Sequence, residues 1–146
     1  NEEYALKRIP YLLEFDTPSV RFVSCEPLMS ALDLSPFLFS ENGKPRLDWV
    51  IAGGESGHGA RPMNPAWPED LQRQCAKAKV PFHFKQWGHW APATNFEVPH
   101  GYPEKKIVHF IKNNRQVSVI SVGKTAAGRV LGGKTWDQFP STRLTA

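Results

Sequence analysis

The sequence contains little cysteine and no long apolar run. Its two cysteines, Cys25 and Cys75, stand in no Cys-x-x-Cys pair and near no run of Cys and His ligands. This spacing disfavours a zinc site or an iron–sulfur cluster held by the chain itself, and it favours two reduced thiols in a cytosolic protein. No apolar stretch approaches the ~20 residues of a membrane-spanning helix. We therefore expect a cytoplasmic protein without a membrane-embedded part.

The start of the chain lacks two further features. It has no basic segment followed by an apolar one, so it shows no secretory signal. It also has no initiator methionine, which leads us to expect a piece of a longer protein. Proline and glycine are plentiful, with 13 and 11 residues scattered over the 146 of the chain. They indicate many turns rather than a low-complexity segment.

Charge is distributed unevenly along the sequence. Residues 1–90 hold ten Lys or Arg against eleven Asp or Glu, whereas residues 91–146 hold eight against three. A basic segment of this kind can bind phosphate backbones or an acidic partner, or it can form an ordinary solvated surface. Basic and aromatic residues alternate at 105–115, which keeps single-stranded nucleic acid open as a partner of the C-terminal region.

Apolar spacing predicts an α/β chain. It indicates helices over residues 2–15 and about 64–79, and strands over 20–25, 47–52 and 81–87. This order is typical of a parallel sheet with right-handed crossovers. After residue 90 we expect a Pro-rich connection, a hairpin that turns at 112–115, and a short helix over 124–131. We accordingly divide the chain into a partial βα body, residues 1–90, and a basic C-terminal extension, residues 91–146, packed on that body.

Polar residues follow each of the three predicted strands. Because ligands bind at the carboxyl ends of parallel strands, we expect these side chains to meet at one rim. The candidate catalytic residues are Glu26, Glu55, Lys85 and Gln86, and the candidate cofactor-binding residues are Ser24, Gly53, Gly54, Ser56 and Arg61.

The rim and its glycine-rich loop each admit two interpretations. Two carboxylates and one ammonium could perform acid–base chemistry or hold an amino-acid-like ligand, with Lys85 on the ligand carboxylate. The same groups could instead form a buried ion-pair network that orders the strand ends. The loop at 53–59 could let backbone amides and Arg61 approach a ligand, or it could be a tight turn with positive φ. It matches neither the P-loop nor the dinucleotide-binding pattern in detail.

Three histidines also lie near these strand ends. His58, His83 and His89 could be drawn into a metal site with the carboxylates, but nothing in their spacing requires one. We therefore predict no metal site. Trp87 and Trp90 are better explained as caps on the core than as rings that stack on a base.

An ordered set of short segments resembles a known family. The segments are RFVSCEPL at 21–28, LDWVIAGGESG at 47–57, ARPM at 60–63, PFHFKQWG at 81–88, VGK at 122–124, AAGR at 126–129 and WDQFP at 136–140. Together they resemble the C-terminal part of a phage-associated family of uncharacterised proteins. That family is radical-SAM-like and carries a three-cysteine motif near its N-terminus. The resemblance covers nearly the whole chain apart from 91–104.

The resemblance implies a fold and two cofactors. The fold would be the C-terminal portion of a parallel βα barrel, TIM-like and radical-SAM-like, with a small hairpin and helix appended. The N-terminal half of such a barrel would bind a [4Fe–4S] cluster and S-adenosylmethionine, which would make the longer protein a radical-SAM-type enzyme. The three-cysteine motif is missing from this sequence. This chain alone would therefore hold no cofactor and would be catalytically inert.

Two hypotheses of function follow from these observations. In the first, the chain supplies polar rim residues to a site for a small-molecule or macromolecular substrate. In the alternative, it is a binding module for nucleic acid or a phage-encoded partner, through its basic C-terminal region. A half-barrel also leaves one strand edge open, and that edge could pair in a homodimer.

Overall fold

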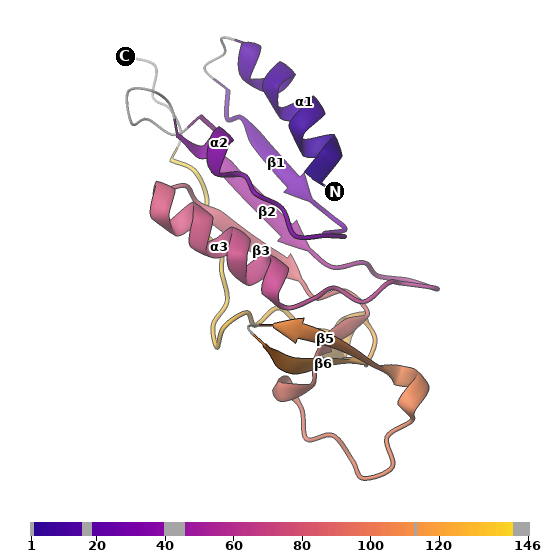
Figure 1. The fold of residues 1–146 in the computed structure, drawn as a ribbon. Coiled ribbons are helices and arrows are strands. Elements are labelled where there is room, and N and C mark those ends of the chain that lie inside the picture. The colour runs from indigo at the N-terminus through magenta and orange to yellow at the C-terminus, as the bar shows by residue number, and fades with distance from the viewer. Residues whose placement is uncertain (1, 16–18, 40–45, 113, 142–146) are drawn as a thin grey trace.

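Two small sheets, one parallel and one antiparallel, organise the chain in this computed structural model (Figure 1). The structure describes residues 2–15, 19–39, 46–112 and 114–141. The helices are α1 (Glu2–Glu14), α2 (Ser35–Leu38), α3 (Ala66–Ala78) and α4 (Lys124–Ala127), with 3-10 turns at Ala93–Asn95 and Glu104–Lys106. The strands are β1 (Phe22–Cys25), β2 (Trp49–Gly53), β3 (Phe82–Gln86), β4 (Trp90–Pro92), β5 (Ile107–Lys112) and β6 (Arg115–Ser121).

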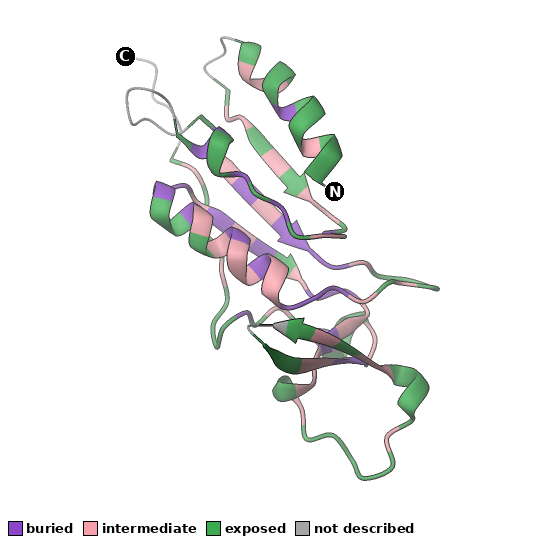
Figure 2. Ribbon diagram, in the orientation of Figure 1, coloured by how far each residue is buried: buried purple, intermediate pink, exposed green. Residues whose placement is uncertain are grey.

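The parallel sheet has the order β1-β2-β3, and the main core lies on one of its faces. Alternation along the strands directs Val50 and Phe82 to this face, where both are fully buried. The helices α1, α2 and α3 lie along this side of the sheet (Figures 1 and 2). Burying such side chains is the chief source of stability in a domain of this size. The largest fully buried side chains of this core are Leu34, Leu38, Leu47, Leu71, Phe82, Phe84 and Leu131.

The opposite face of the parallel sheet carries aromatic rings and, among the described residues, no helix. The Trp49 ring lies 5.7 Å from Phe22, 6.0 Å from His83 and 5.3 Å from Phe139. Phe22 and Phe139 remain exposed. Burial, followed by the charge of Arg129, lowers the pKa of His83, so the imidazole is neutral at pH 7. We call this surface the aromatic face.

The antiparallel sheet, in the order β4-β6-β5, packs beside the N-terminal end of α3. Phe110 of β5 lies 6.2 Å from the Trp67 ring, and Trp90 Nε1 donates to the Ala60 carbonyl at 2.7 Å. The strand β4 was not predicted, because a three-residue strand that ends at Pro92 has no recognisable apolar period. The hairpin between β5 and β6 turns through Asn114, whose φ of 59° is left-handed.

Residues 128–138, which we call the strap, run back along the outer edge of β3. The Phe84 amide donates to the Trp136 carbonyl at 3.0 Å, and the Gln138 amide donates to the Phe82 carbonyl at 3.3 Å. The Gln138 side chain also accepts from the Phe82 amide at 3.0 Å. The strap therefore continues the sheet by one antiparallel segment.

The prediction of a partial βα barrel is wrong. The chain is a small α/β domain in which the parallel sheet has three strands and the appended hairpin belongs to a separate antiparallel sheet. A barrel needs a further parallel strand beside β3, and the strap occupies that position. The order of helices and strands fits a barrel segment and a small open sheet equally well, and the pairing of the strap is not visible in apolar spacing. None of the helices in the described ranges is long and apolar enough to cross a bilayer.

Candidate functional site

One ion pair joins the two outer strands of the parallel sheet at their carboxyl ends. Glu26 follows β1 directly, and Lys85 lies near the end of β3. Lys85 Nζ donates to Glu26 Oε2 at 2.9 Å, with the Glu26 side chain 20% exposed and the Lys85 side chain 56%. The contact spans the middle strand, β2. The structure thus brings together two of the residues predicted for the rim.

Gly53, at the end of β2, makes this crossing possible. A Cβ atom at position 53 would overlap Glu26 Oε1 and lie 3.2 Å from Glu26 Cδ, so any larger residue would displace the carboxylate. Glu26 Oε1 is buried and has no hydrogen-bond donor among the described residues. Leaving a buried acceptor unpaired typically costs about 1–3 kcal/mol. One oxygen of Glu26 is therefore satisfied by Lys85, and the other has no donor in the described part of the chain.

A β-bulge positions Lys85 for this contact. The register pairs Ala52 with Phe84 and then Gly53 with Gln86, so Lys85 is an extra residue in β3. A bulge bends its strand and re-aims a side chain. Gln86 is held by its backbone, whose carbonyl accepts from the Gly54 amide at 2.9 Å.

Glu55 does not join this pair but turns to Arg61 within its own loop. The guanidinium makes two contacts with the carboxylate, Nε to Oε2 and Nη2 to Oε1, both at 2.8 Å. The Arg61 amide also donates to Oε2 at 2.8 Å. The hydrogen bonds from Arg61 lower the pKa of Glu55 to about 2. Glu55 is therefore a permanent carboxylate near neutral pH and has no proton to donate.

The Glu55–Arg61 pair predicts a specific acid titration. In the folded chain the Glu55 pKa of about 2 lies below its ordinary value of 4.5, so the stability from this pair is complete above pH 4.5 and is lost as the pH falls towards 2. We expect Arg61→Gln to raise the Glu55 pKa towards its ordinary value without reaching it, because the backbone amide of residue 61 still donates to the carboxylate. Carbon-13 NMR titration of the glutamate carboxyl groups measures it. Arg73→Gln, which breaks the exposed pair with Asp70, should leave Glu55 unchanged, and a wild-type midpoint near 4.5 would contradict the prediction.

Gly53 and Gly54, at the start of the loop, allow neighbouring groups to pack closely against the backbone. The Gly54 amide already donates to Gln86, and a Cβ atom there would overlap the Trp87 carbonyl. Gly53 makes room for Glu26, and its carbonyl accepts from the Leu28 amide at 2.9 Å. The backbone amide of Gly54 is thus not free to cradle a ligand. Positive φ occurs later in the loop, at Gly57 and Gly59, whereas Gly53 and Gly54 are required for close packing.

The remaining predicted site residues lie at different distances from the ion pair. Ser24 precedes Glu26 by two positions on the same face of β1 and is exposed. Ser56 is exposed in the loop, beyond Glu55. Ser24 is therefore near enough to share a ligand with Glu26, whereas Ser56 belongs to the Glu55–Arg61 part of the loop.

The cysteines and histidines are not gathered around a metal. Within the described ranges, no group of three His, Cys, Asp or Glu residues is placed to hold an ion. His89 contacts the Ser121 hydroxyl at 2.9 Å through Nε2. Burial raises the pKa of Cys25 to about 11 and that of Cys75 to about 12, so neither is the thiolate that an iron–sulfur cluster needs. These residues do not fit a cluster.

Sequence reasoning missed Gly88 and the aromatic face. Gly88 has a φ of +84°, and a Cβ atom there would overlap the Glu55 carbonyl, so it fixes how closely the two loops approach. Trp49, Ile51 and Gly53 share one face of β2 and alternate with Val50 and Ala52, and this period of two was the available signal for a second, uncovered face. The nearly continuous apolar character of β2 obscured it.

Comparison with known proteins identifies a family for this chain. A family model described as "Protein of unknown function (DUF5131)" matches residues 1–140. No curated protein and no solved structure matches the chain at a significant level.

Proposed function

This chain belongs to the DUF5131 family, and we propose that it binds a small ligand carrying both an ammonium and a carboxylate group at the Glu26–Lys85 pair. The observation that carries the proposal is the crossing of Glu26 over Gly53 to Lys85, which leaves one buried carboxylate oxygen without a donor.

The chemistry of the two groups fits a zwitterion. A carboxylate accepts from an ammonium, and a lysine ammonium has three donors, of which the structure uses one on Glu26. In the bound state the ligand ammonium would pair with Glu26, and the ligand carboxylate would pair with Lys85. Both charges are therefore paired before and after binding, so binding leaves no isolated buried charge.

The resemblance to the radical-SAM-like family supports one candidate ligand. S-adenosylmethionine ends in an amino-acid group of the required kind, and the proposed contacts would hold that end. No step of the proposal runs through an iron–sulfur cluster, because Cys25 and Cys75 do not fit one. The substrate and the reaction of a longer phage-associated enzyme stay predictions.

Isothermal titration calorimetry tests the proposal with S-adenosylmethionine and L-methionine as probes. We expect Glu26→Gln and Lys85→Met each to weaken binding at least tenfold, because each removes one charge-assisted contact. Lys124→Met is the matched control, since Lys124 is exposed beside the antiparallel sheet, and it should leave affinity unchanged. 4-(Methylthio)butanoate, which is methionine without its ammonium, should bind no more tightly to the wild type than to Glu26→Gln.

The structural interpretation of the same pair predicts a different result. If the pair only orders the strand ends, both substitutions lower the midpoint of thermal unfolding and neither probe binds the wild type. Equal affinity of the wild type and both variants would also overturn the proposal.

The basic C-terminal region supports the nucleic-acid alternative less well. Arg129 pairs with Asp137, and Lys134 lies 4.0 Å from the centre of the Trp136 ring. Phe110 is packed on Trp67 and is not free to stack on a base.

We also propose that the protein is cytoplasmic. The free thiols of both cysteines support this proposal, because disulfides are rare in that compartment.

A further inference from the structure

The two edges of the parallel sheet differ. The strap pairs with β3, whereas β1 is the opposite edge strand and has β2 as its one partner strand among the described residues. An edge strand presents a row of backbone donors and acceptors that another strand can pair with. The free edge of β1 is therefore the place where this sheet can be extended.

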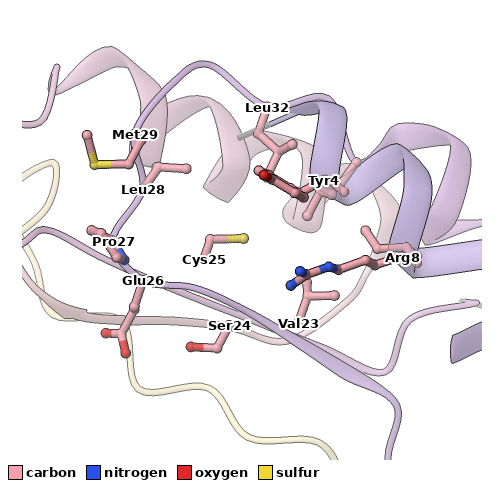
Figure 3. Close-up of a pocket in the computed structure, with 13 residues that line it drawn as sticks. Tyr4, Arg8, Val23, Ser24, Cys25, Glu26, Pro27, Leu28, Met29 and Leu32 are labelled. Carbon is pink, nitrogen blue, oxygen red and sulfur yellow. The ribbon is translucent and has the colours of Figure 1, made fainter.

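A cavity of about 370 Å³ lies along β1, between this strand and α1. We call it the α1–β1 groove. Its lining includes Tyr4, Arg8 and Ile9 of α1, Val23, Ser24 and Cys25 of β1, and Glu26 and Leu28 after β1 (Figure 3). The Arg8 guanidinium and the Cys25 thiol point toward each other across it, while the Glu26 carboxylate points away (Figure 3). Glu26 thus belongs to the lining of the groove, but its carboxylate is already paired with Lys85.

The outer surface of α1 is apolar next to this groove. Tyr4, Tyr11 and Phe15 are 54%, 66% and 68% exposed. Tyr4 and Tyr11 are seven positions apart, which places them on one side of the helix, in line with Arg8, and Phe15 follows directly after the helix ends at Glu14. A row of exposed aromatic side chains of this size usually marks an interaction surface.

Arg8 supplies the charge of the groove. Its guanidinium lies 5.1 Å from the centre of the Tyr4 ring, and no carboxylate in the described part of the chain pairs with it. An acidic group that enters the groove would therefore gain a charge-assisted contact without breaking an existing ion pair.

We infer that an extended segment of a partner protein adds to the free edge of β1 as a new strand and sets a carboxylate against Arg8. Backbone hydrogen bonds to β1 hold the segment, and alternate apolar side chains enter the groove, as in strand addition to other sheet edges. A second copy of this chain fits less well, because its own edge strand, Phe22–Cys25, contains no acidic residue.

Fluorescence anisotropy with the labelled peptide Thr-Val-Thr-Glu-Thr-Val-Thr tests the inference. Its valines and its glutamate project from one face when it is extended. We expect it to bind the wild type at least tenfold more tightly than the same peptide with Lys in place of Glu. Arg8→Glu should reverse this preference. Lys7→Glu, on a neighbouring side of α1, should not reverse it.

Two further measurements decide whether binding occurs as a strand. Methylation of alternate peptide amides should abolish binding, and the unmethylated peptide should slow hydrogen exchange of the β1 amides. Equal binding of the methylated peptide, or no binding of the acidic peptide, would overturn the inference. A dimer in sedimentation velocity that Arg8→Glu dissociates would also overturn it, because the edge would then belong to a second copy.

Discussion

A chain that ends at Ala127 should fail to fold cooperatively. Truncation there removes the strap, and with it the backbone bonds to Phe82 and Phe84, the carbonyl of Gly128 that accepts from the Trp87 amide, and the buried side chain of Leu131. A buried leucine alone contributes about 2–5 kcal/mol, and each hydrogen bond about 1 kcal/mol. Together these losses are comparable to the ~5–15 kcal/mol by which a whole domain is stable.

Circular dichroism during heating measures this effect, and we expect no sharp transition for the truncated chain. Gln138→Ala is a milder test, because it removes one hydrogen bond between the strap and β3 instead of the whole strap. It leaves the Phe82 amide without its side-chain acceptor and should cost about 1–3 kcal/mol while the transition stays cooperative. Gln116→Ala, at an exposed position of the hairpin, should change stability by less than about 0.5 kcal/mol. A cooperative transition in the truncated chain would show that the strap is dispensable.

Gly54→Ala should be the most damaging single substitution in the loop after β2. Its Cβ atom would overlap the carbonyl oxygen and carbon of Trp87, and backbone cannot move aside as a side chain can. We expect a loss of about 3 kcal/mol or more in the free energy of unfolding. Chemical denaturation monitored by tryptophan fluorescence gives this quantity.

Gly57→Ala separates a steric clash from backbone strain. Gly57 has a φ of +101° and no atom within 4 Å of a Cβ built there, so its substitution adds conformational strain alone, about 1 kcal/mol. We therefore expect Gly54→Ala to lower the free energy of unfolding more than Gly57→Ala, although Gly54, unlike Gly57, does not have a positive φ. Equal losses at the two positions would mean that the loop and the Trp87 backbone separate easily.

The two long helices and the three parallel strands of residues 1–90 were predictable because each is decided locally. The apolar spacing of α3, from Trp67 to Ala78, and the β-branched and aromatic residues of β1 indicate their structures without knowledge of the rest of the chain. The strap could not be predicted in this way. Its pairing depends on Gln138 meeting Phe82, which lies 56 positions away, and no local period encodes such a contact.

The candidate site also contains some features that the sequence predicts and others that require the structure. The position of polar residues at strand ends was enough to place Glu26 near Lys85, since parallel strands end at one edge. The partner of Glu55 was not predictable from strand order, because Arg61 reaches it through the path of the intervening loop. The role of Gly53 also required the structure, since a glycine that admits a carboxylate and a glycine that admits a ligand look alike in the sequence.

The unequal edges of the parallel sheet limit how large an assembly of this chain can become. A filament of stacked sheets needs two open edges on every subunit, so that each copy can receive one neighbour and offer itself to another. Here the strap covers the edge of β3, and it pairs there through an isolated bridge rather than a full strand. Among the described residues of the parallel sheet, β1 is therefore the one full strand with an open edge, which favours the addition of a single partner over open-ended growth of this sheet.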